Sequence, residues 1–227
     1  MKRRKFFLFG APLLMVLAGM IACSSDDNPA PASKLPQPEN SIIGERGQTF
    51  LKEGKTWNCK LVQSGPDSYT EYYKNVIRGD SIVDGTLYFK MFRETDIISE
   101  LDFYALWREN GGKVFAYVPY EGKERLMYDF STQPGSVVAC EGANTQIETT
   151  IIVTVGDRDF NCLSVLVYDD HLVTWVEGVG SPFGPTNPLG PLFTDGKKTE
   201  LLSCYEEGKL IFESADFNKA HEMLDRK

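Results

Sequence analysis

The chain has 227 residues, with 24 Lys and Arg against 32 Asp and Glu, so its formal net charge is −8 at pH 7. The chain is acidic and has no basic cluster in its main domain, so its net charge repels the phosphate backbone of nucleic acids. Nucleic acid is therefore excluded as an expected partner. After an N-terminal targeting segment, the remaining length fits one domain.

The first 22 residues have the order of charged and apolar residues that is typical of a secretory signal peptide. Four cations, at positions 2–5, precede an apolar run from Phe6 to Ala22. The run has 17 residues and contains Gly10 and Pro12, whereas a membrane-spanning helix needs about 20 apolar residues. We therefore predict that residues 1–22 are cleaved rather than retained as a membrane helix.

The end of this run, MIAC, resembles a bacterial lipobox, although methionine stands at position 20, where that family most often has leucine. The resemblance implies that Cys23 becomes the lipidated first residue of the mature protein. The next four residues resemble the surface-export signal of Bacteroidetes lipoproteins: Ser24, Ser25, Asp26 and Asp27. The implied location is the outer membrane, exposed on the cell surface. The alternative is its periplasmic face, in which case the two aspartates only solvate a linker. The bilayer is then a partner through acyl chains, each buried CH₂ contributing roughly 0.8 kcal/mol.

Residues 23–41 are predicted to form a disordered tether behind the lipidated cysteine. They contain four prolines and almost no large apolar side chains, so they cannot bury enough surface to fold. Residues 42–227 are predicted to form a single β-rich domain. Cleavage of the signal peptide leaves 20 cations against 32 acids, a net charge of −12.

Short strand-like runs fill this domain in chain order. Runs rich in aromatic and β-branched residues occupy 86–94, 101–109, 112–120, 149–155 and 163–169. Glycine, Asn and Asp mark tight turns at 83–86, 109–113, 121–124, 156–159 and 206–209. The pattern predicts an all-β fold, an antiparallel meander that forms a barrel or a strongly curved sheet. A two-sheet β-sandwich is the alternative.

Helical periodicity occurs in two places, around residues 41–52 and in the tail at 214–227. In the tail, the residues expected to share one face are Phe217, Ala220, Met223 and Leu224, with Ser214 or Asp216 as the N-cap. We therefore predict a short C-terminal helix.

The domain contains four cysteines: Cys59, Cys140, Cys162 and Cys204. An even number in an exported domain predicts two disulfides, with buried free thiols as the alternative. No CxxC pair or Cys/His cluster is present, so no metal site is predicted.

Hairpin register restricts the disulfide pairings. A turn at 156–159 in which paired residue numbers sum to 315 places Cys162 opposite Val153, and a turn just after Cys140 places Cys140 near Gln146. Those partners are about seven residues, or roughly 23 Å, apart on one strand, whereas a disulfide needs Cα atoms within about 7 Å. The remaining pairings are Cys59 with Cys140 or Cys162 and Cys204 with the other, or a single Cys59–Cys204 bond.

The run TWVEGVGSPFGP at 174–185 is the most motif-like part of the chain. Gly178 and Gly180 precede Ser181, which suggests a phosphate cradle or a nucleophile turn. A dinucleotide site requires a helix N-terminus after the glycines, and a nucleophile elbow requires the order G-x-S-x-G. Four prolines follow instead. We predict a kink at which the strand leaves the sheet, followed by a long surface loop to about Gly196.

Glu177 interrupts an otherwise apolar strand and is expected on the same face as Trp175. A glutamate on a buried face must be paired, hydrogen-bonded or have a raised pKa. Glu177 is therefore the first candidate for a catalytic carboxylate. The alternatives are a solvent-facing position or a structural ion pair with an arginine. The candidate ligand or structural site comprises Trp175, Glu177, Gly178, Gly180 and Ser181. No catalytic residue is assigned, since His171 belongs to a polar turn without a nucleophile, and no cofactor is predicted.

Four segments in order resemble a widespread β-rich family of secreted and lipid-anchored Bacteroidetes proteins with an EGIGS-like signature: 104–118, 125–136, 175–185 and 201–212. The resemblance covers roughly Trp57 to Phe212 and implies export and an extracellular β-domain, without an established activity. Some relatives have a further cysteine before the last strand. This chain has none between Cys162 and Cys204, which leaves the partner of Cys204 open.

These observations predict a cell-surface lipoprotein whose domain binds an extracellular glycan, peptide or protein without catalysis. Two other hypotheses stay open. One is an exported hydrolase that uses buried carboxylates, and the other is a β-barrel carrier of a small apolar ligand.

Overall fold

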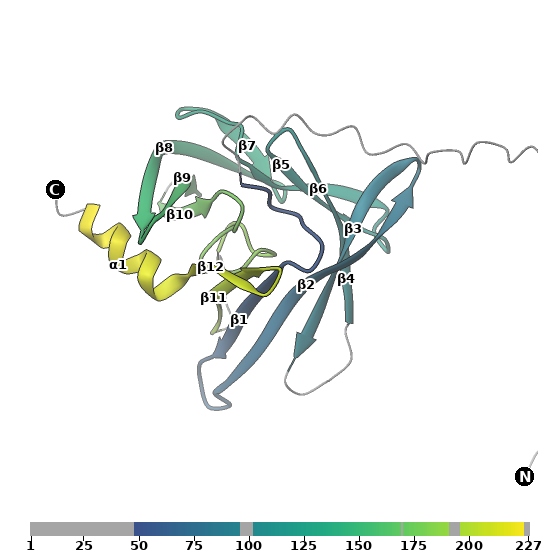
Figure 1. The fold of residues 1–227 in the computed structure, drawn as a ribbon, viewed down its shortest axis with the longest axis horizontal. Coiled ribbons are helices and arrows are strands. Elements are labelled where there is room, and N and C mark those ends of the chain that lie inside the picture. Colours follow the sequence, from purple (N-terminus) through teal and green to yellow (C-terminus); the bar gives the residue numbers. More distant parts are fainter. Residues whose placement is uncertain (1–47, 96–101, 169, 191–195, 225–227) are drawn as a thin grey trace, which may run out of the picture. The chain divides into compact units, whose positions relative to one another are not determined.

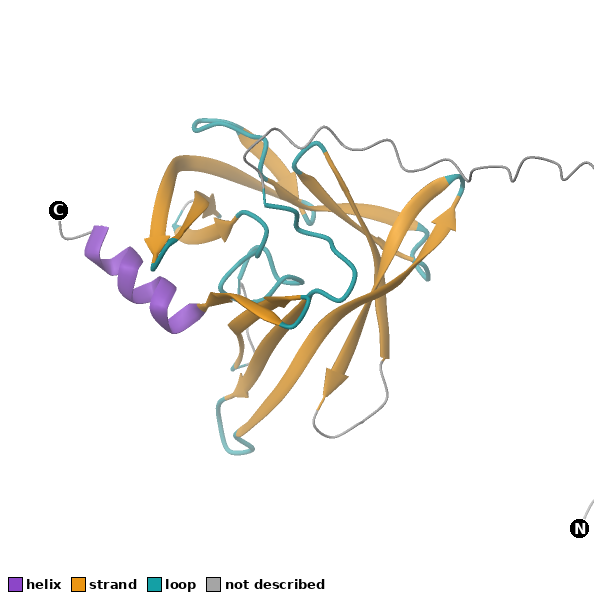
Figure 2. Cartoon of the chain, viewed as in Figure 1, coloured by secondary structure: helices purple, strands orange, loops and turns teal. Residues whose placement is uncertain are grey.

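The computed structural model describes residues 48–95, 102–168, 170–190 and 196–224. The predicted signal peptide and tether lie outside these residues, as do Cys23 and the export signal at 24–27. Strands dominate the described chain, with a single helix at its C-terminal end (Figure 2). The predicted all-β class with a short C-terminal helix is therefore confirmed.

Eight antiparallel strands form a large, strongly curved sheet (Figure 1). Their spatial order is β12-β11-β1-β2-β3-β4-β5-β6, so the first six strands form a meander and the last two extend it beside β1. The strands are β1 (Thr56–Gln63), β2 (Tyr69–Val83), β3 (Thr86–Thr95), β4 (Asp102–Asn110), β5 (Lys113–Val118), β6 (Lys123–Asp129), β11 (Lys197–Glu206) and β12 (Lys209–Glu213).

A second antiparallel sheet has the order β10-β9-β8-β7. It comprises β7 (Val137–Cys140), β8 (Ala143–Val155), β9 (Arg158–Val167) and β10 (His171–Val176). A backbone hydrogen bond from Glu141 N to Leu126 O, 2.9 Å long, joins its β7 end to β6 of the large sheet. At the other side, the helix α1 (Ser214–Leu224) contacts β8 as well as β11 and β12.

The predicted turns connect the strands, but two hairpins are tighter than expected. Val155 pairs with Arg158, so paired numbers along β8 and β9 sum to 313 rather than 315 and Cys162 faces Ile151. Cys140 pairs directly with Ala143 instead of lying near Gln146. Both connections are two-residue loops, the form whose backbone twist matches that of the flanking strands.

Large aromatic side chains fill the space between the two sheets. Trp57, Trp107 and Tyr128 are fully buried, and the ring of Phe50 lies against all three, at centroid distances of 5.6, 6.2 and 5.2 Å respectively. Phe50 belongs to the segment before β1, which crosses between the sheets in Figure 1. The helix expected around 41–52 lies partly outside the described residues, and residues 48–52 are not helical.

The apolar face of α1 is only half buried. Phe217 is buried against Phe160 and Phe212, with ring centroids 6.0 and 5.2 Å apart, whereas Met223 and Leu224 are exposed. These two residues belong to the end of α1 that points away from the strands in Figure 1, where no sheet is left to cover them. The burial of this face therefore ends before the last turn of α1.

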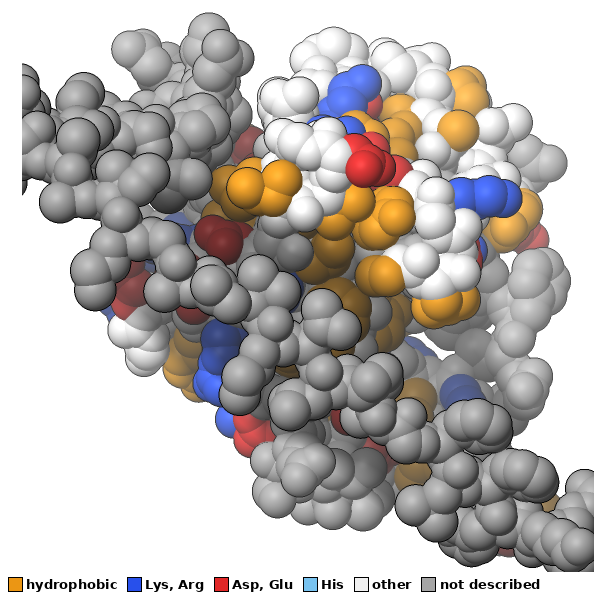
Figure 3. Space-filling model, turned by 90° about the vertical axis from the view of Figure 1, so that its right-hand side faces the viewer, with side chains coloured by type: hydrophobic (Ala, Val, Ile, Leu, Met, Phe, Trp, Pro, Cys, Tyr) orange, Lys and Arg blue, Asp and Glu red, His pale blue; other side chains and the backbone are white. Residues whose placement is uncertain are grey.

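The part of the surface that Figure 3 displays carries hydrophobic side chains interspersed with acidic and basic ones. Within residues 48–224, excluding the gaps given above, no helix is long and apolar enough to cross a membrane.

Candidate ligand-binding site around Glu177

The glycine-proline run after β10 lies inside the fold. The prediction of a surface loop is wrong for its described part, because Val179, Ser181 and Leu189 are buried together with every glycine from 178 to 190. A buried irregular segment must find partners for its backbone polar groups. The side chains that supply these partners come from elements on both sides of the run.

Aromatic donors from three strands bind carbonyl groups of this segment. The indole N–H of Trp57 donates to Val179 O at 2.8 Å, that of Trp175 to Pro188 O at 2.8 Å, and the hydroxyl of Tyr128 to Pro185 O at 2.9 Å. Each ring fills the core while its polar atom is satisfied. Trp175, a predicted site residue, therefore has a structural role and is closed to solvent.

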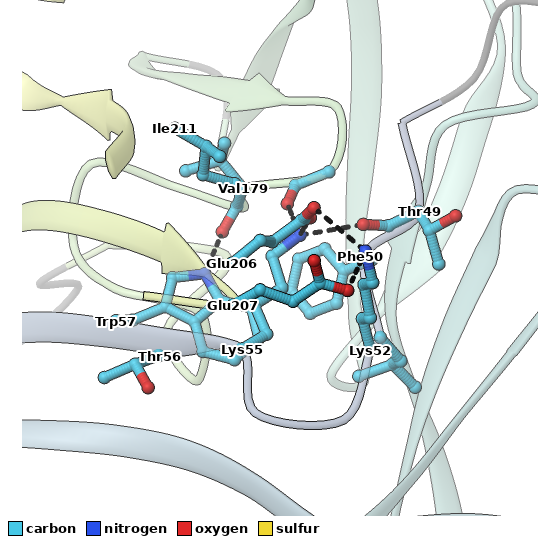
Figure 4. Close-up of polar contacts among 12 residues, drawn as sticks. Thr49, Phe50, Lys52, Lys55, Thr56, Trp57, Val179, Glu206, Glu207 and Ile211 are labelled. Carbon is cyan, nitrogen blue, oxygen red and sulfur yellow. Dashed lines mark hydrogen bonds and ion pairs between the residues drawn. The ribbon is translucent and has the colours of Figure 1, made fainter. Parts of the chain in front are cut away.

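Lys55 is the fourth donor and is fully buried. Its Nζ lies 2.8 Å from Thr49 O, 2.6 Å from Gly178 O and 2.8 Å from Glu206 Oε1 (Figure 4). An ammonium group has three donors, and these three contacts use all of them. This role was not predicted, because a lysine that directly follows a turn glycine is typical of the surface.

The hydroxyl of Ser181 binds backbone groups and is not placed as a nucleophile. Its hydroxyl lies 2.6 Å from Asn187 O and 3.2 Å from Gly184 O, and it accepts the N–H of Phe183 at 3.1 Å. With 1% of its surface exposed, it has no access to a substrate. The rejection of a nucleophile elbow on sequence grounds is consistent with this geometry.

The glycines of the run are required by close packing. Gly178 has φ +75°, and a Cβ there would lie 2.5 Å from Gln48 Cβ. Gly180 has φ +110°, and a Cβ there would lie 3.1 Å from the Tyr128 hydroxyl. Both positions therefore need a residue that tolerates positive φ and has no side chain.

Glu177 differs from its neighbours because its carboxylate reaches a solvent-accessible pocket. Oε2 accepts a hydrogen bond from Asn161 Nδ2 at 2.8 Å, and the backbone N–H of Glu177 donates to Asn161 O at 2.9 Å. No arginine pairs with it among the ion pairs of the described residues. The residue is half-buried at the end of β10, so a partly solvent-facing position is the correct one of the predicted alternatives.

The pocket has a volume of about 380 Å³ and lies where β8, β9 and the segment after β6 meet. Its polar lining comprises Thr132, Gln133, Thr149, Thr150, Asn161 and Glu177, and its apolar lining includes Phe130 and Leu163. The ring of Phe130 stacks on Tyr128 at a centroid distance of 5.4 Å, which fixes this wall on the core. Sequence reasoning identified Glu177 but missed Asn161, which only the β9 register brings beside it.

A second carboxylate, Glu109 at the end of β4, interacts electrostatically with Glu177. Burial is the main cause that raises the pKa of Glu109; the charge of Lys55 opposes this rise, and the negative charge of Glu177 makes the smallest contribution, in the raising direction. The backbone N–H groups of Phe50 and Leu51 donate to Glu109 Oε2 at 2.9 and 3.1 Å and oppose this rise. Glu109 does not line the pocket and instead fastens the segment before β1.

The four described cysteines are free and buried, so the predicted disulfides are wrong. Cys140 and Cys162 pair with Ala143 and Ile151, eight positions apart on β8. Cys59 and Cys204 lie on adjacent strands, but a bulge sets them out of register, since Cys59 faces Leu201 and Cys204 faces Trp57. The expected separation of Cys140 from Cys162 is consistent with this register.

Burial also keeps these thiols unreactive. It raises the pKa of Cys59, Cys162 and Cys204 to about 12 and raises that of Cys140 as well. The thiol form therefore predominates at neutral pH, and the thiolate is the reactive species. These side chains act as small apolar residues of the core.

Among the residues that the structure describes, no group of three or more His, Cys, Asp or Glu side chains could hold a metal ion. His171, at the start of β10, lies with its ring 6.4 Å from that of Phe183, and its buried Nε2 has no hydrogen-bond partner.

Comparison of the chain with protein-family models, with curated proteins and with solved structures finds no match.

Proposed function

We propose that the protein is a surface-anchored lipoprotein that binds a polar, hydroxyl-rich extracellular ligand, a glycan, in the pocket around Glu177. It acts as a binding module rather than as an enzyme. The resemblance to exported and lipid-anchored Bacteroidetes proteins supports the proposed location, and the lining of the pocket supports the proposed ligand class.

The observation that carries the proposal is the carboxylate of Glu177, held by Asn161 at 2.8 Å in an accessible pocket. Carboxylate oxygens accept hydrogen bonds from sugar hydroxyls, and amide groups both accept from and donate to them. An aromatic wall covers apolar ring carbons. The lining of this pocket has that composition, with hydroxyl and amide side chains next to Phe130 and Leu163. Its volume of about 380 Å³ suits a small ligand or one or two residues of a longer chain.

A test is a glycan-array screen of the purified full-length protein beside its Glu177→Gln variant. The substitution keeps the shape of the side chain but removes the charge that strengthens hydrogen bonds to ligand hydroxyls, so we expect binding to weaken about tenfold or more. A matched control is Glu71→Gln, which makes the same change on β2 of the other sheet and should leave binding unchanged. Absence of glycan binding by the parent protein, or equal loss in both variants, would contradict the proposal.

The hydrolase is a second candidate, because Glu177 is a carboxylate in an accessible pocket and a second buried carboxylate, Glu109, is weakly influenced by its charge. Two carboxyl groups with different environments are the usual basis of glycoside hydrolysis. Against this candidate, Glu109 binds two backbone amides and lies outside the pocket lining. Incubation of a bound glycan with the protein decides between the two, because release of shorter products by the parent but not by Glu177→Gln would identify an enzyme.

The carrier hypothesis gains no support, because the space between the sheets is occupied by aromatic side chains and by the run after β10. That space would have to be empty to hold an apolar ligand.

A further inference from the structure

The charge of the pocket around Glu177 restricts the kind of sugar that it can take. Glu177 is the single charged side chain in the described lining, whose other polar members carry neutral hydroxyl and amide groups. Among the residues that the structure describes, Asn161 is the one hydrogen-bond donor to this carboxylate, through Oε2. The two oxygens of a carboxylate accept about four hydrogen bonds and donate none. Oε1 and part of Oε2 therefore remain for a group of the ligand.

The wall of the pocket at residues 130–134 is fixed to the rest of the fold. Backbone hydrogen bonds run from Phe130 N to Gly112 O at 2.8 Å and from Gly135 N to Ile147 O at 2.7 Å, so the wall is bound at both of its ends. A preformed site loses little free energy to its own ordering when a ligand binds. The charge distribution of this pocket is therefore the one that an incoming ligand meets.

The surroundings of the pocket add to its negative character. Burial is the main cause that raises the pKa of Glu109 and of Cys162, and the negative charge of Glu177 adds a small rise to each. Lys55 also acts on Glu109, but its Nζ is already bound to three acceptors, among them Glu206. A half-buried carboxylate attracts an opposite charge more strongly than it would in bulk water. The pocket therefore repels anionic groups and favours a cationic one.

We propose that the glycan bound by this pocket contains an amino sugar with a free, protonated amine, and that its ammonium group pairs with Glu177. This inference rests on the proposed glycan-binding function and specifies the class of sugar. An ammonium group carries three donors and one positive charge, so a single contact neutralises the carboxylate and fills its free acceptor positions. Thr150 and Gln133 line the same pocket and suit the sugar hydroxyls, while Phe130 provides an apolar wall.

Other classes of sugar match the pocket less well. A uronic acid would place a second carboxylate beside Glu177, and the described lining contains no lysine, arginine or histidine to compensate it. An N-acetylated or unmodified sugar is neutral, so it can donate hydrogen bonds but leaves the charge of the carboxylate unpaired.

The experiment is isothermal titration calorimetry of the purified full-length protein, at constant ionic strength and at a pH at which the amine is protonated. The probes are the disaccharides of glucosamine, of N-acetylglucosamine and of glucose, which share one linkage and differ at the second carbon of each sugar. We expect the glucosamine disaccharide to bind about fivefold more tightly than the other two, a modest factor because solvent screens a partly exposed ion pair.

Two results would overturn the amino-sugar inference directly. One is a glucosamine disaccharide that does not bind, or binds no more tightly than the other two. The other is equal binding of the amide of N-acetyl-lysine, because the pocket would then recognise any ammonium group without a sugar. Neither result contradicts the proposed function, which fails only if the protein binds no glycan on the array.

Glu177→Gln tests whether the carboxylate causes the preference. The variant keeps the shape of the side chain but removes its charge, so its affinity for the glucosamine disaccharide should fall to that for the glucose disaccharide. The matched control is Glu148→Gln, which makes the same change at an exposed position of β8 outside the pocket lining and should keep the preference. Equal loss in both variants would assign the preference to the net charge of the protein and overturn the inference.

Thr150→Lys tests the same ion pair from the protein side. Thr150 is an exposed pocket residue whose cross-strand partner is Leu163, so it shares a face of the sheet with Asn161. The introduced ammonium should pair with Glu177 and remove the preference for the glucosamine disaccharide. Thermal unfolding confirms that each variant is folded, and if Glu177→Gln is unfolded, Thr150→Lys decides alone. An undiminished preference in folded Thr150→Lys would overturn the inference.

Discussion

At the scale of single residues, the core of this protein depends on polar atoms carried by large side chains. Lys55, Trp57 and Trp175 are fully buried, yet each of their donor groups reaches a backbone carbonyl of the run after β10. A buried polar group costs several kcal/mol when it is left unpaired, and little when it is paired. Replacing one of these donors with an apolar side chain therefore leaves a buried carbonyl unpaired and lowers the free energy of unfolding, even where the packing of the core is kept.

Lys55→Met tests this balance. Methionine fills a similar volume but leaves Thr49 O, Gly178 O and Glu206 without their buried donor. We expect a loss of about 3 kcal/mol in the free energy of unfolding, measured by urea denaturation. The matched control is Lys52→Met, which removes an exposed lysine that pairs with the same Glu206 and with Glu207. Because solvent screens the ion pairs of Lys52, Lys52→Met should lower the free energy of unfolding much less than Lys55→Met does. Equal losses would show that the buried contacts of Lys55 contribute nothing specific.

At the scale of elements, the segment from Val176 to Gly190 acts as an internal layer between the two sheets. It has turn hydrogen bonds of its own, such as that from Gly184 N to Ser181 O at 3.1 Å. Side chains from β1, β6 and β10 bind further carbonyls of the segment. Its position also fixes Glu177, because the carboxylate is presented where the segment leaves β10. Disturbing the path of this segment should therefore affect stability and the candidate pocket together.

Gly178→Ala is the corresponding test, with Gly156→Ala as its control. Both glycines have positive φ, +75° and +63°, but a Cβ at Gly178 would lie 2.5 Å from Gln48 Cβ, whereas none of the surrounding atoms lies within 4 Å at Gly156. The shared backbone strain should cost about 1 kcal/mol in each variant. The steric clash should make Gly178→Ala at least about twice as destabilising in urea denaturation. A loss no larger than that of Gly156→Ala would mean that the segment moves aside freely.

At the scale of the whole molecule, the proposal concerns how an acidic β-domain is attached to the outer membrane. The proposed anchor is Cys23, which the lipobox resemblance identifies as the acylation site. Acyl chains on one cysteine would give a strong attachment through the burial of many CH₂ groups. The domain itself then needs no apolar membrane-binding surface, and the part of the surface that Figure 3 shows carries acidic, basic and hydrophobic side chains.

Cys23→Ala should abolish palmitate labelling and release the protein from the membrane fraction, because the acceptor thiol is gone. Replacing Asp26 and Asp27 with alanine should leave labelling intact but reduce access of external protease to the domain in whole cells. Unchanged labelling in Cys23→Ala would contradict the lipoprotein proposal, and unchanged protease access in the second variant would place the domain's export under another signal.

The sequence alone determined the all-β class, the hairpin turns and the C-terminal helix, because these depend on local signals: alternation of side chains, glycines with positive φ, and helical periodicity. It also excluded a nucleophile elbow and a dinucleotide cradle in the run at 174–185, since both need a defined neighbouring element. Glu177 was recognisable as an acid in an apolar strand.

Only the tertiary structure decided where these pieces meet. A run rich in glycine and proline was expected at the surface because such runs are typical of loops. Several of its buried carbonyls are bound by Lys55, Trp57 and Tyr128, which are far away in sequence. Tighter loops in two hairpins moved the partners of Cys162 and Cys140 from the expected Val153 and the region of Gln146 to Ile151 and Ala143. A bulge kept Cys59 and Cys204 out of register. Asn161 beside Glu177 is likewise a product of strand pairing, because pairing between strands follows from how the whole chain packs rather than from any local pattern.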